Sequence, residues 1–153
     1  MVLVAPILLA LMVPAPSLGA LAVKNKRTDH APALAEAPAD GEIRLFEIAY
    51  AAQSDRFAAD SGIEAGMPVD FLGFVSQDKL PGGRIELSRF YVGCCAADAR
   101  AYSVELTPPA GTPPLALDTW VRVQGKLTGR PGSTLGVAAT SISEVDQPAN
   151  PYN

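Results

Sequence analysis

"MPVDFLGFVSQDKLPGGRIEL", residues 67–87, decides the fold class, because it predicts two strands joined by a tight turn. Apolar residues of both parities occur between Val69 and Val75, which is typical of a strand that is covered on both faces. The sequence Pro-Gly-Gly at 81–83 separates this strand from the next, and glycine readily adopts the positive φ angles that such turns need. The segment therefore predicts an antiparallel hairpin.

The second strand of this hairpin changes the face on which its apolar residues lie. Ile85 and Leu87 have one parity, whereas Phe90 and Val92 have the other. A change of face without a break in the strand implies one extra residue. We therefore expect a β-bulge near residues 88–89 that bends the strand sharply.

Three further segments have the pattern of strands. Residues 100–107, RAYSVELT, alternate polar and apolar side chains. Residues 119–129, TWVRVQGKLTG, direct valines inward and place Gly125 at an inward position, where a barrel bends or a neighbouring chain approaches. Residues 134–145, TLGVAATSISEV, supply a fifth strand, which we expect to bend at its middle.

The predicted fold is mainly β: a small five-stranded, OB-like barrel (oligonucleotide/oligosaccharide-binding type), with a β-sandwich as the alternative. Residues 41–53, GEIRLFEIAYAAQ, place apolar residues near helical spacing after Asp40 as a candidate N-cap, and they predict one short amphipathic helix that packs on the sheet. Residues 55–66 predict a polar turn region. The helix that an OB fold has between its third and fourth strands is missing from the pattern, so we call the fold OB-like.

An N-terminal membrane helix is expected to precede this domain. Residues 1–23 carry no charged side chain, and a bilayer core of about 30 Å needs ~20 mostly apolar residues, although prolines within the run would kink or end a helix early. A signal peptide and a buried core helix are the alternatives, but the basic cluster at 24–27 follows the run, whereas signal peptides carry it in front. We expect a single-pass protein of the cell membrane with an extracytoplasmic C-terminal domain. Orientation stays open, because basic residues after the span, taken alone, favour the cytoplasmic side.

The chain is expected to divide into four parts. The second part, residues 24–40, is Ala/Pro-rich with mixed charge and no apolar period, as an exposed linker is. The expected parts are a membrane helix (1–23), a linker (24–40), an OB-like barrel domain (41–147) and a C-terminal tail (148–153).

The formal net charge of the chain is −4, whereas a groove that follows phosphates needs positive charge. Nucleic acid is therefore not expected as a partner.

The most distinctive polar motif is RFYVGCCAADA at 89–99, which sets Cys94 beside Cys95 and places Asp98 three residues later. A thiolate pair with a nearby carboxylate makes a partial zinc or copper site, and zinc is the cofactor considered. Neighbouring side chains of a strand point to opposite faces, so both thiols reach one ion only if the chain turns there. The only histidine, His30, lies in the linker, so a closed four-ligand site would need it or a partner protein.

Two other interpretations of Cys94 and Cys95 remain open. A disulfide between adjacent cysteines closes a small strained ring, and strained disulfides are labile, as in redox sensors. Alternatively the cysteines act as small hydrophobic residues, one packing the barrel and the other its outer layer, with Asp98 capping the turn.

Two more residues are expected to take part in binding together with Asp98. Arg89 lies at the expected bulge, where it either pairs with Asp98 or extends into solvent. Trp120 lies on the face opposite Val121, where it either covers the outer side of the barrel or belongs to a partner-binding patch.

Residues 73–106, 120–127 and 147–153 together resemble the C-terminal domain of the YcgQ-like family of bacterial membrane proteins. The most specific parts are the RF-x3-CC-x-AD-A block at 89–99 and the NPY sequence at 150–152, and residues 6–26 are similar to the last membrane helix of that family. The resemblance implies a subunit of a two-component permease, with a membrane part of two or more helices and a multi-helix permease as partner.

The expected function is a membrane-anchored accessory subunit of a two-component permease, in which the OB-like domain acts as a binding or gating module, with a metal ion as candidate ligand. The alternative is a stand-alone extracytoplasmic module that binds metal or senses redox state through the Cys94–Cys95 pair. An enzyme is not expected, because His30 lies outside the strands and no Ser/His/Asp or paired-carboxylate spacing occurs within them.

Overall fold

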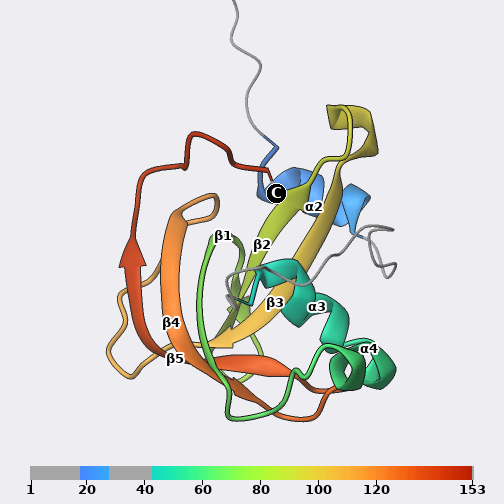
Figure 1. The fold of residues 1–153 in the computed structure, drawn as a ribbon. Helices are drawn as coiled ribbons and strands as arrows, with labels where there is room; N and C mark the ends of the chain where they lie inside the picture. Colours follow the sequence, from blue (N-terminus) through green and yellow to red (C-terminus); the bar gives the residue numbers. More distant parts are fainter. Residues whose placement is uncertain (1–17, 28–42, 153) are drawn as a thin grey trace, which may run out of the picture.

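The computed structural model describes residues 18–27 and 43–152. Five strands form a sheet in the order β1-β2-β3-β5-β4, and β4 pairs again with β1, so the sheet closes into a barrel (Figure 1). The strands are β1 Pro68–Leu80, β2 Arg84–Tyr91, β3 Arg100–Thr107, β4 Trp120–Thr128 and β5 Gly136–Glu144. The described helices are α2 Ala20–Lys26, α3 Leu45–Ala51, α4 Asp55–Asp60 and the 3₁₀ helix η1 Ala96–Asp98.

The pairing pattern confirms the prediction of a mainly β, five-stranded fold. All neighbouring strands are antiparallel except β3 and β5, which pair in parallel. The β-sandwich alternative is wrong, because the sheet closes on itself instead of splitting into two packed layers. The connection between β3 and β4 is described throughout and contains no helix, as the sequence pattern indicated.

The inside of the barrel is filled by the inward side chains of all five strands, and α3 packs against this core. The ring of Phe46 in α3 lies 6.1 Å from that of Tyr91 and 5.9 Å from that of Tyr102, centre to centre. The prediction that the helix within 41–53 packs on the sheet is confirmed, although the helix begins only after Arg44 and its proposed cap, Asp40, lies outside the described residues. Part of the predicted polar turn region is instead a helix, α4.

α4 is well capped and packed, but it is too short to be recognised from the sequence pattern. Ser54 is its N-cap, and the Ser54 hydroxyl accepts a hydrogen bond from the Phe57 backbone N–H at 3.1 Å. The Phe57 ring then packs edge-on against Tyr50, with 4.6 Å between ring centres. The helix has only six residues, too few to produce a recognisable apolar period.

Gly125 and the bend in β5 were both predicted correctly. The pair Gln124–Ser141 is followed by Gly125–Ala139, so Thr140 is an extra residue and β5 bulges there. A Cβ atom at position 125 would overlap the Ala138 carbonyl oxygen and lie 2.9 Å from the Ala139 Cα atom. Glycine therefore permits the close approach of the two strands at this bend.

The bulge predicted near residues 88–89 is wrong. β2 pairs with β3 without interruption, and the irregular positions lie in the β1–β2 ladder, on either side of Gln77. The parity change in β2 has another cause, because this strand serves two separate cores. Leu87 points into the barrel, whereas Phe90 belongs to a cluster on its outer face.

This outer cluster lies between the barrel and α2. The rings of Phe74 and Phe90 are 5.7 Å apart and those of Phe74 and Trp120 are 5.5 Å apart, and Ala20 and Val23 of α2 pack on them. Val23 is only 1% exposed. Figure 1 shows α2 lying against the outer side of the strands.

The placement of α2 corrects the predicted boundary between a membrane helix and a linker. α2 crosses the position 23/24, and its apolar side faces the barrel. Residues 1–17, which carry most of the predicted membrane helix, lie outside the described residues, as does most of the linker. Within the described ranges 18–27 and 43–152, no helix is long and apolar enough to cross a bilayer.

A buried carboxylate joins the end of α2 to the outer face of β2. Glu86 is 5% exposed, and it accepts two hydrogen bonds from Arg27 at 2.8 and 3.0 Å, one from Ser76 at 2.7 Å and one from Gln77 at 3.2 Å. The Ser88 hydroxyl continues this network from Ser76. Arg27, the last residue of the basic cluster at 24–27, thus ties the end of α2 to the sheet.

Candidate functional site

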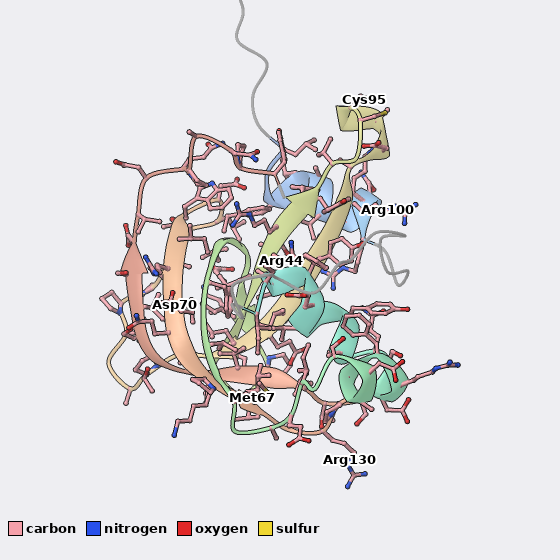
Figure 2. The ribbon with its side chains drawn as sticks, viewed as in Figure 1. Arg44, Met67, Asp70, Cys95, Arg100 and Arg130 are labelled. Carbon is pink, nitrogen blue, oxygen red and sulfur yellow. The ribbon has the colours of Figure 1, made fainter. Side chains whose placement is uncertain are left out.

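The connection between β2 and β3, residues 92–99, projects from the barrel and carries both cysteines; we call it the thiol turn. Its chain bends at 93–95 and then forms η1. Cys94 and Cys95 are free and exposed, and Figure 2 shows Cys95 at the outer end of the connection. The interpretation of the cysteines as buried packing residues is therefore wrong, because the turn carries them away from the sheet.

Asp98 organises the thiol turn. Its carboxylate accepts hydrogen bonds from three successive backbone N–H groups: Gly93 at 3.2 Å, Cys94 at 2.7 Å and Cys95 at 3.4 Å. The pKa of Asp98 is lowered, chiefly by the Cys94 N–H, because these donors favour the charged form. Asp98 thus caps the turn as one interpretation of the sequence proposed.

The two thiols have different acidities. The pKa of Cys95 is lowered, chiefly because the Ala97 backbone N–H donates to its sulfur. The pKa of Cys94 is raised, chiefly because its S–H donates to the Asp98 carboxylate. As pH rises, Cys95 therefore becomes a thiolate first, while Cys94 keeps its proton to higher pH.

This difference predicts the order of alkylation. With limiting iodoacetamide, we expect Cys95 to be modified at lower pH than Cys94, because the thiolate is the reactive form. Peptide mass spectrometry across a pH series measures both positions in one sample. In an Asp98→Asn variant, the alkylation profile of Cys94 should move to lower pH, because the carboxylate that holds its proton is gone. Equal profiles, or faster modification of Cys94, would contradict this assignment.

The thiol turn also contacts α2. The Lys26 ammonium donates to the Ala97 carbonyl oxygen at 2.8 Å, and Arg27 forms an isolated bridge with Ala101 in β3. The backbone that carries the two thiols is therefore held at its base by the β2–β3 ladder and on one side by α2.

The described residues do not assemble a closed zinc site. Across residues 18–27 and 43–152, no group of three or more His, Cys, Asp or Glu side chains is placed to hold an ion. The Asp98 carboxylate is directed at backbone N–H groups, and His30 lies outside the described residues. Cys94 and Cys95 are thus the two side chains of this turn that remain as metal donors.

The other predicted binding residues lie elsewhere. Arg89 does not pair with Asp98: it donates to the Asn150 carbonyl oxygen at 3.2 Å, and its guanidinium lies 5.7 Å from the centre of the Trp120 ring. Trp120 is 9% exposed and belongs to the outer cluster, so it covers the barrel. The structure therefore brings Arg89 and Trp120 together. This pair does not belong to the contacts that build the thiol turn.

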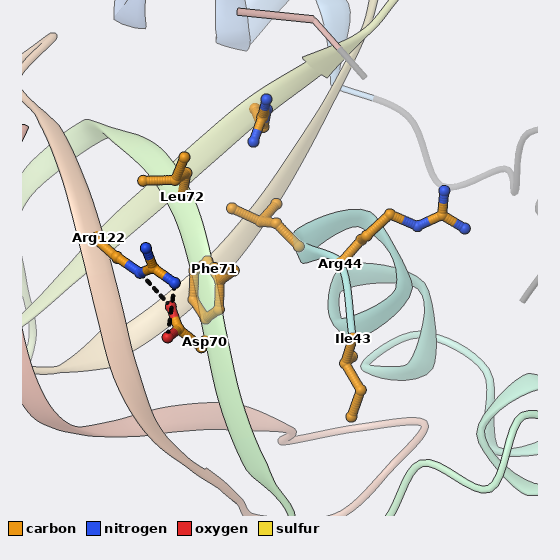
Figure 3. A pocket seen from close by; sticks show the side chains of 8 residues that line it. Ile43, Arg44, Asp70, Phe71, Leu72 and Arg122 are labelled. Atoms are coloured by element: carbon orange, nitrogen blue, oxygen red, sulfur yellow. Dashed lines mark hydrogen bonds and ion pairs between the residues drawn. The ribbon is translucent and has the colours of Figure 1, made fainter. Parts of the chain in front are cut away.

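Sequence reasoning missed a second polar location, a cavity between β1, β4 and the start of α3 that we call the arginine cavity. It encloses ≈ 210 Å³, and its polar lining comprises Arg44, Asp70, Arg89 and Arg122. Figure 3 shows Asp70 and Arg122 joined across two strands. Their outward positions in the alternating pattern were the available signal, but the β1–β4 register that pairs them is non-local and cannot be derived from spacing.

The closed five-stranded sheet, with its exposed thiol turn and polar cavity, defines a small mainly β domain of the OB-like class. The chain belongs to the DUF1980 family: residues 21–153 match the DUF1980 C-terminal domain. This assignment fits the resemblance to the YcgQ-like family. No curated protein matches the chain.

Among solved structures, the chain is similar to the telomere capping protein Ten1 from Saccharomyces pombe, with 16% identity over 68% of this chain and 79% of that one, at a TM-score of 0.38. It is also similar to a small single-stranded DNA-binding protein from Streptomyces coelicolor, with 19% identity over 56% of this chain and 100% of that one, at a TM-score of 0.40. Both proteins are named for telomere or single-stranded DNA functions, and the expectation that nucleic acid is not a partner is withdrawn. Likeness at this level assigns no partner, nucleic acid or permease, to this chain.

Proposed function

We propose that this domain is a binding module, not an enzyme, and that Cys94 and Cys95 bind a soft metal ion on the thiol turn. The observation that carries the proposal is that both thiols are free and exposed, at adjacent positions on a turn outside the sheet. Thiolates are soft ligands that favour ions such as Cu(I) over hard cations. Two of them are too few for a closed zinc site, which takes four ligands.

Each residue of the turn has a separate role in this proposal. Cys95, whose pKa is lowered, is the first ligand, and Cys94 becomes the second when the ion displaces its proton. Asp98 holds the backbone at 93–95 in its turn and adds a negative charge near the bound cation. Because Cys94 must lose a proton, the affinity for the ion should rise with pH through the range in which Cys94 titrates.

Metal titrations of the full chain test the proposal. Under anaerobic conditions, Cu(I) is titrated in competition with a chromophoric chelator, and Zn²⁺ is titrated in parallel. We expect one Cu(I) per chain. Either Cys94→Ser or Cys95→Ser should weaken binding by more than about tenfold, since loss of a residue that merely supports a metal ligand already costs roughly 10–100-fold.

Asp98→Asn is the matched control, because it keeps both thiols. It should bind the same number of Cu(I) ions as the wild type. Binding that survives unchanged in both single cysteine variants would exclude the thiol turn as the site, and so would the absence of Cu(I) and Zn²⁺ binding in the wild-type chain.

Redox sensing is a second candidate, favoured by the unequal acidities of the two thiols. Hydrogen peroxide would oxidise the Cys95 thiolate, and the Cys94 thiol would then displace water to close a disulfide. Mass spectrometry of the treated chain should then show a loss of two hydrogens in the peptide that contains both cysteines, without dimer formation. Over-oxidation of Cys95 while Cys94 stays reduced would rule this candidate out.

A further inference from the structure

Arg89 is a half-buried cation whose observed partners are neutral. It contacts the Asn150 carbonyl oxygen and the Trp120 ring, and its Nε atom is buried with no hydrogen-bond partner in the described part of the chain. Burial lowers the pKa of Arg89, because the charged form loses contact with water. A desolvated charge is costly unless an opposite charge or hydrogen-bond acceptors satisfy it.

The arginine cavity lies where β1 and β2 separate. The β1–β2 ladder begins at the pair Phe74–Ser88, so the part of β1 before Phe74 pairs with β4 alone among the described strands. Arg89 follows Ser88 directly and lines the space that the separation leaves. The side chains of Phe71 and Leu72 add apolar surface to the same cavity.

The charged lining of this cavity has more arginines than carboxylates. Asp70 accepts hydrogen bonds from Arg122 at 2.7 and 3.0 Å, which is the main reason that the pKa of Asp70 is lowered, and this pair is neutral as a unit. Arg44 forms an ion pair with Glu47 at 3.5 Å, and Figure 3 shows its guanidinium directed away from Asp70. Among the arginines that line this cavity, Arg89 is therefore the one that the described residues leave without a carboxylate.

We infer that the arginine cavity binds the oxyanion group, a carboxylate or a phosphate, of a small ligand, with Arg89 as its main anchor. A guanidinium presents its N–H donors as a planar fork that matches both groups. The neutral Asp70–Arg122 pair lines the β4 side, and Phe71 and Leu72 provide apolar contact for the rest of the ligand. At ≈ 210 Å³, the cavity is smaller than sites for drug-sized molecules, which start at about 300 Å³.

This site is separate from the thiol turn, and its test involves no thiol chemistry. The ¹⁵N-labelled full chain is titrated by NMR with inorganic phosphate and, separately, with acetate, while chloride keeps the ionic strength constant. We expect saturable shifts of the amides at residues 70–72 and 88–90. Arg89→Gln should weaken binding by at least about tenfold, because it removes a charge-assisted hydrogen bond.

Arg56→Gln is the matched control, because the Arg56 side chain is 90% exposed and lies on α4. It should bind both probes as the wild type does. Arg89→Lys keeps the charge without the fork and should bind more weakly than the wild type, which preserves the test if Arg89→Gln does not fold. Tighter binding of one probe identifies the group recognised. A wild-type chain that responds to neither probe, or a folded Arg89 variant that binds both as tightly as the wild type, would overturn the inference.

Discussion

Phe90→Ala is expected to lower the free energy of unfolding by about 3–5 kcal/mol, the usual cost of truncating a fully buried phenylalanine. Phe90 is 1% exposed, and its ring stacks on Phe74 at 5.7 Å between α2 and the barrel. Its backbone also forms an isolated bridge with Tyr152, so the C-terminal tail contacts the same place. Urea denaturation of the full chain, followed by circular dichroism, measures the change.

Phe57→Ala is the control for this experiment. Phe57 is half-buried in α4 and packs on Tyr50, so its truncation should cost less than that of Phe90. The comparison tests whether α2 docks on the barrel, because Phe90 would otherwise lie on an open face of β2. A cost for Phe90→Ala no larger than that for Phe57→Ala would show that the outer cluster does not form.

The strands could be predicted because the relevant information is local. Alternation along residues 100–107 and the glycine turn at 81–83 each depend on a few neighbouring residues, and both agree with the structure. Gly125 is a further example, since an inward glycine in a strand already indicates a close approach of backbones. Local pattern therefore sufficed for the five strands and, with turn spacing, for the architecture.

The outer cluster shows where local pattern failed. The parity change at Phe90 was interpreted as a bulge, because a strand with one buried face can change parity in no other way. β2 instead buries both faces, and its second cover, α2, comes from a segment whose apolar character favoured a membrane helix. Apolar composition alone does not distinguish these two environments.

The candidate sites were predictable only in part. Adjacent cysteines followed by Asp98 indicated a turn, and the structure places all three residues there. Whether the thiols faced the core or the solvent depended on where β2 ends, which spacing does not determine. The arginine cavity could not be predicted from the sequence, because Asp70 and Arg122 meet only through the pairing of two strands about 50 residues apart.

Arg27→Ala is expected to lower the free energy of unfolding by about 2–3 kcal/mol at neutral pH. The Glu86 side chain is 6% exposed, and without Arg27 its buried carboxylate would keep only two neutral hydrogen-bond partners among the described residues, Ser76 and Gln77. Breaking a fully buried pair costs about 3–5 kcal/mol. The expected value is lower because the Arg27 side chain is 43% exposed, so water screens part of the interaction.

A double-mutant cycle separates this ion pair from the packing of α2. In a Glu86→Gln background, Arg27→Ala should cost less than about 1 kcal/mol, because no buried carboxylate is left unpaired. Arg56→Ala supplies the surface reference, since Arg56 and Asp60 are 90% and 73% exposed and such pairs contribute about 0–1 kcal/mol. If Arg27→Ala cost no more than Arg56→Ala, Glu86 would have to be hydrated and the end of α2 undocked. A coupling of about 1–2 kcal/mol between Arg27 and Glu86 would instead establish that the basic cluster at 24–27 is part of the folded domain.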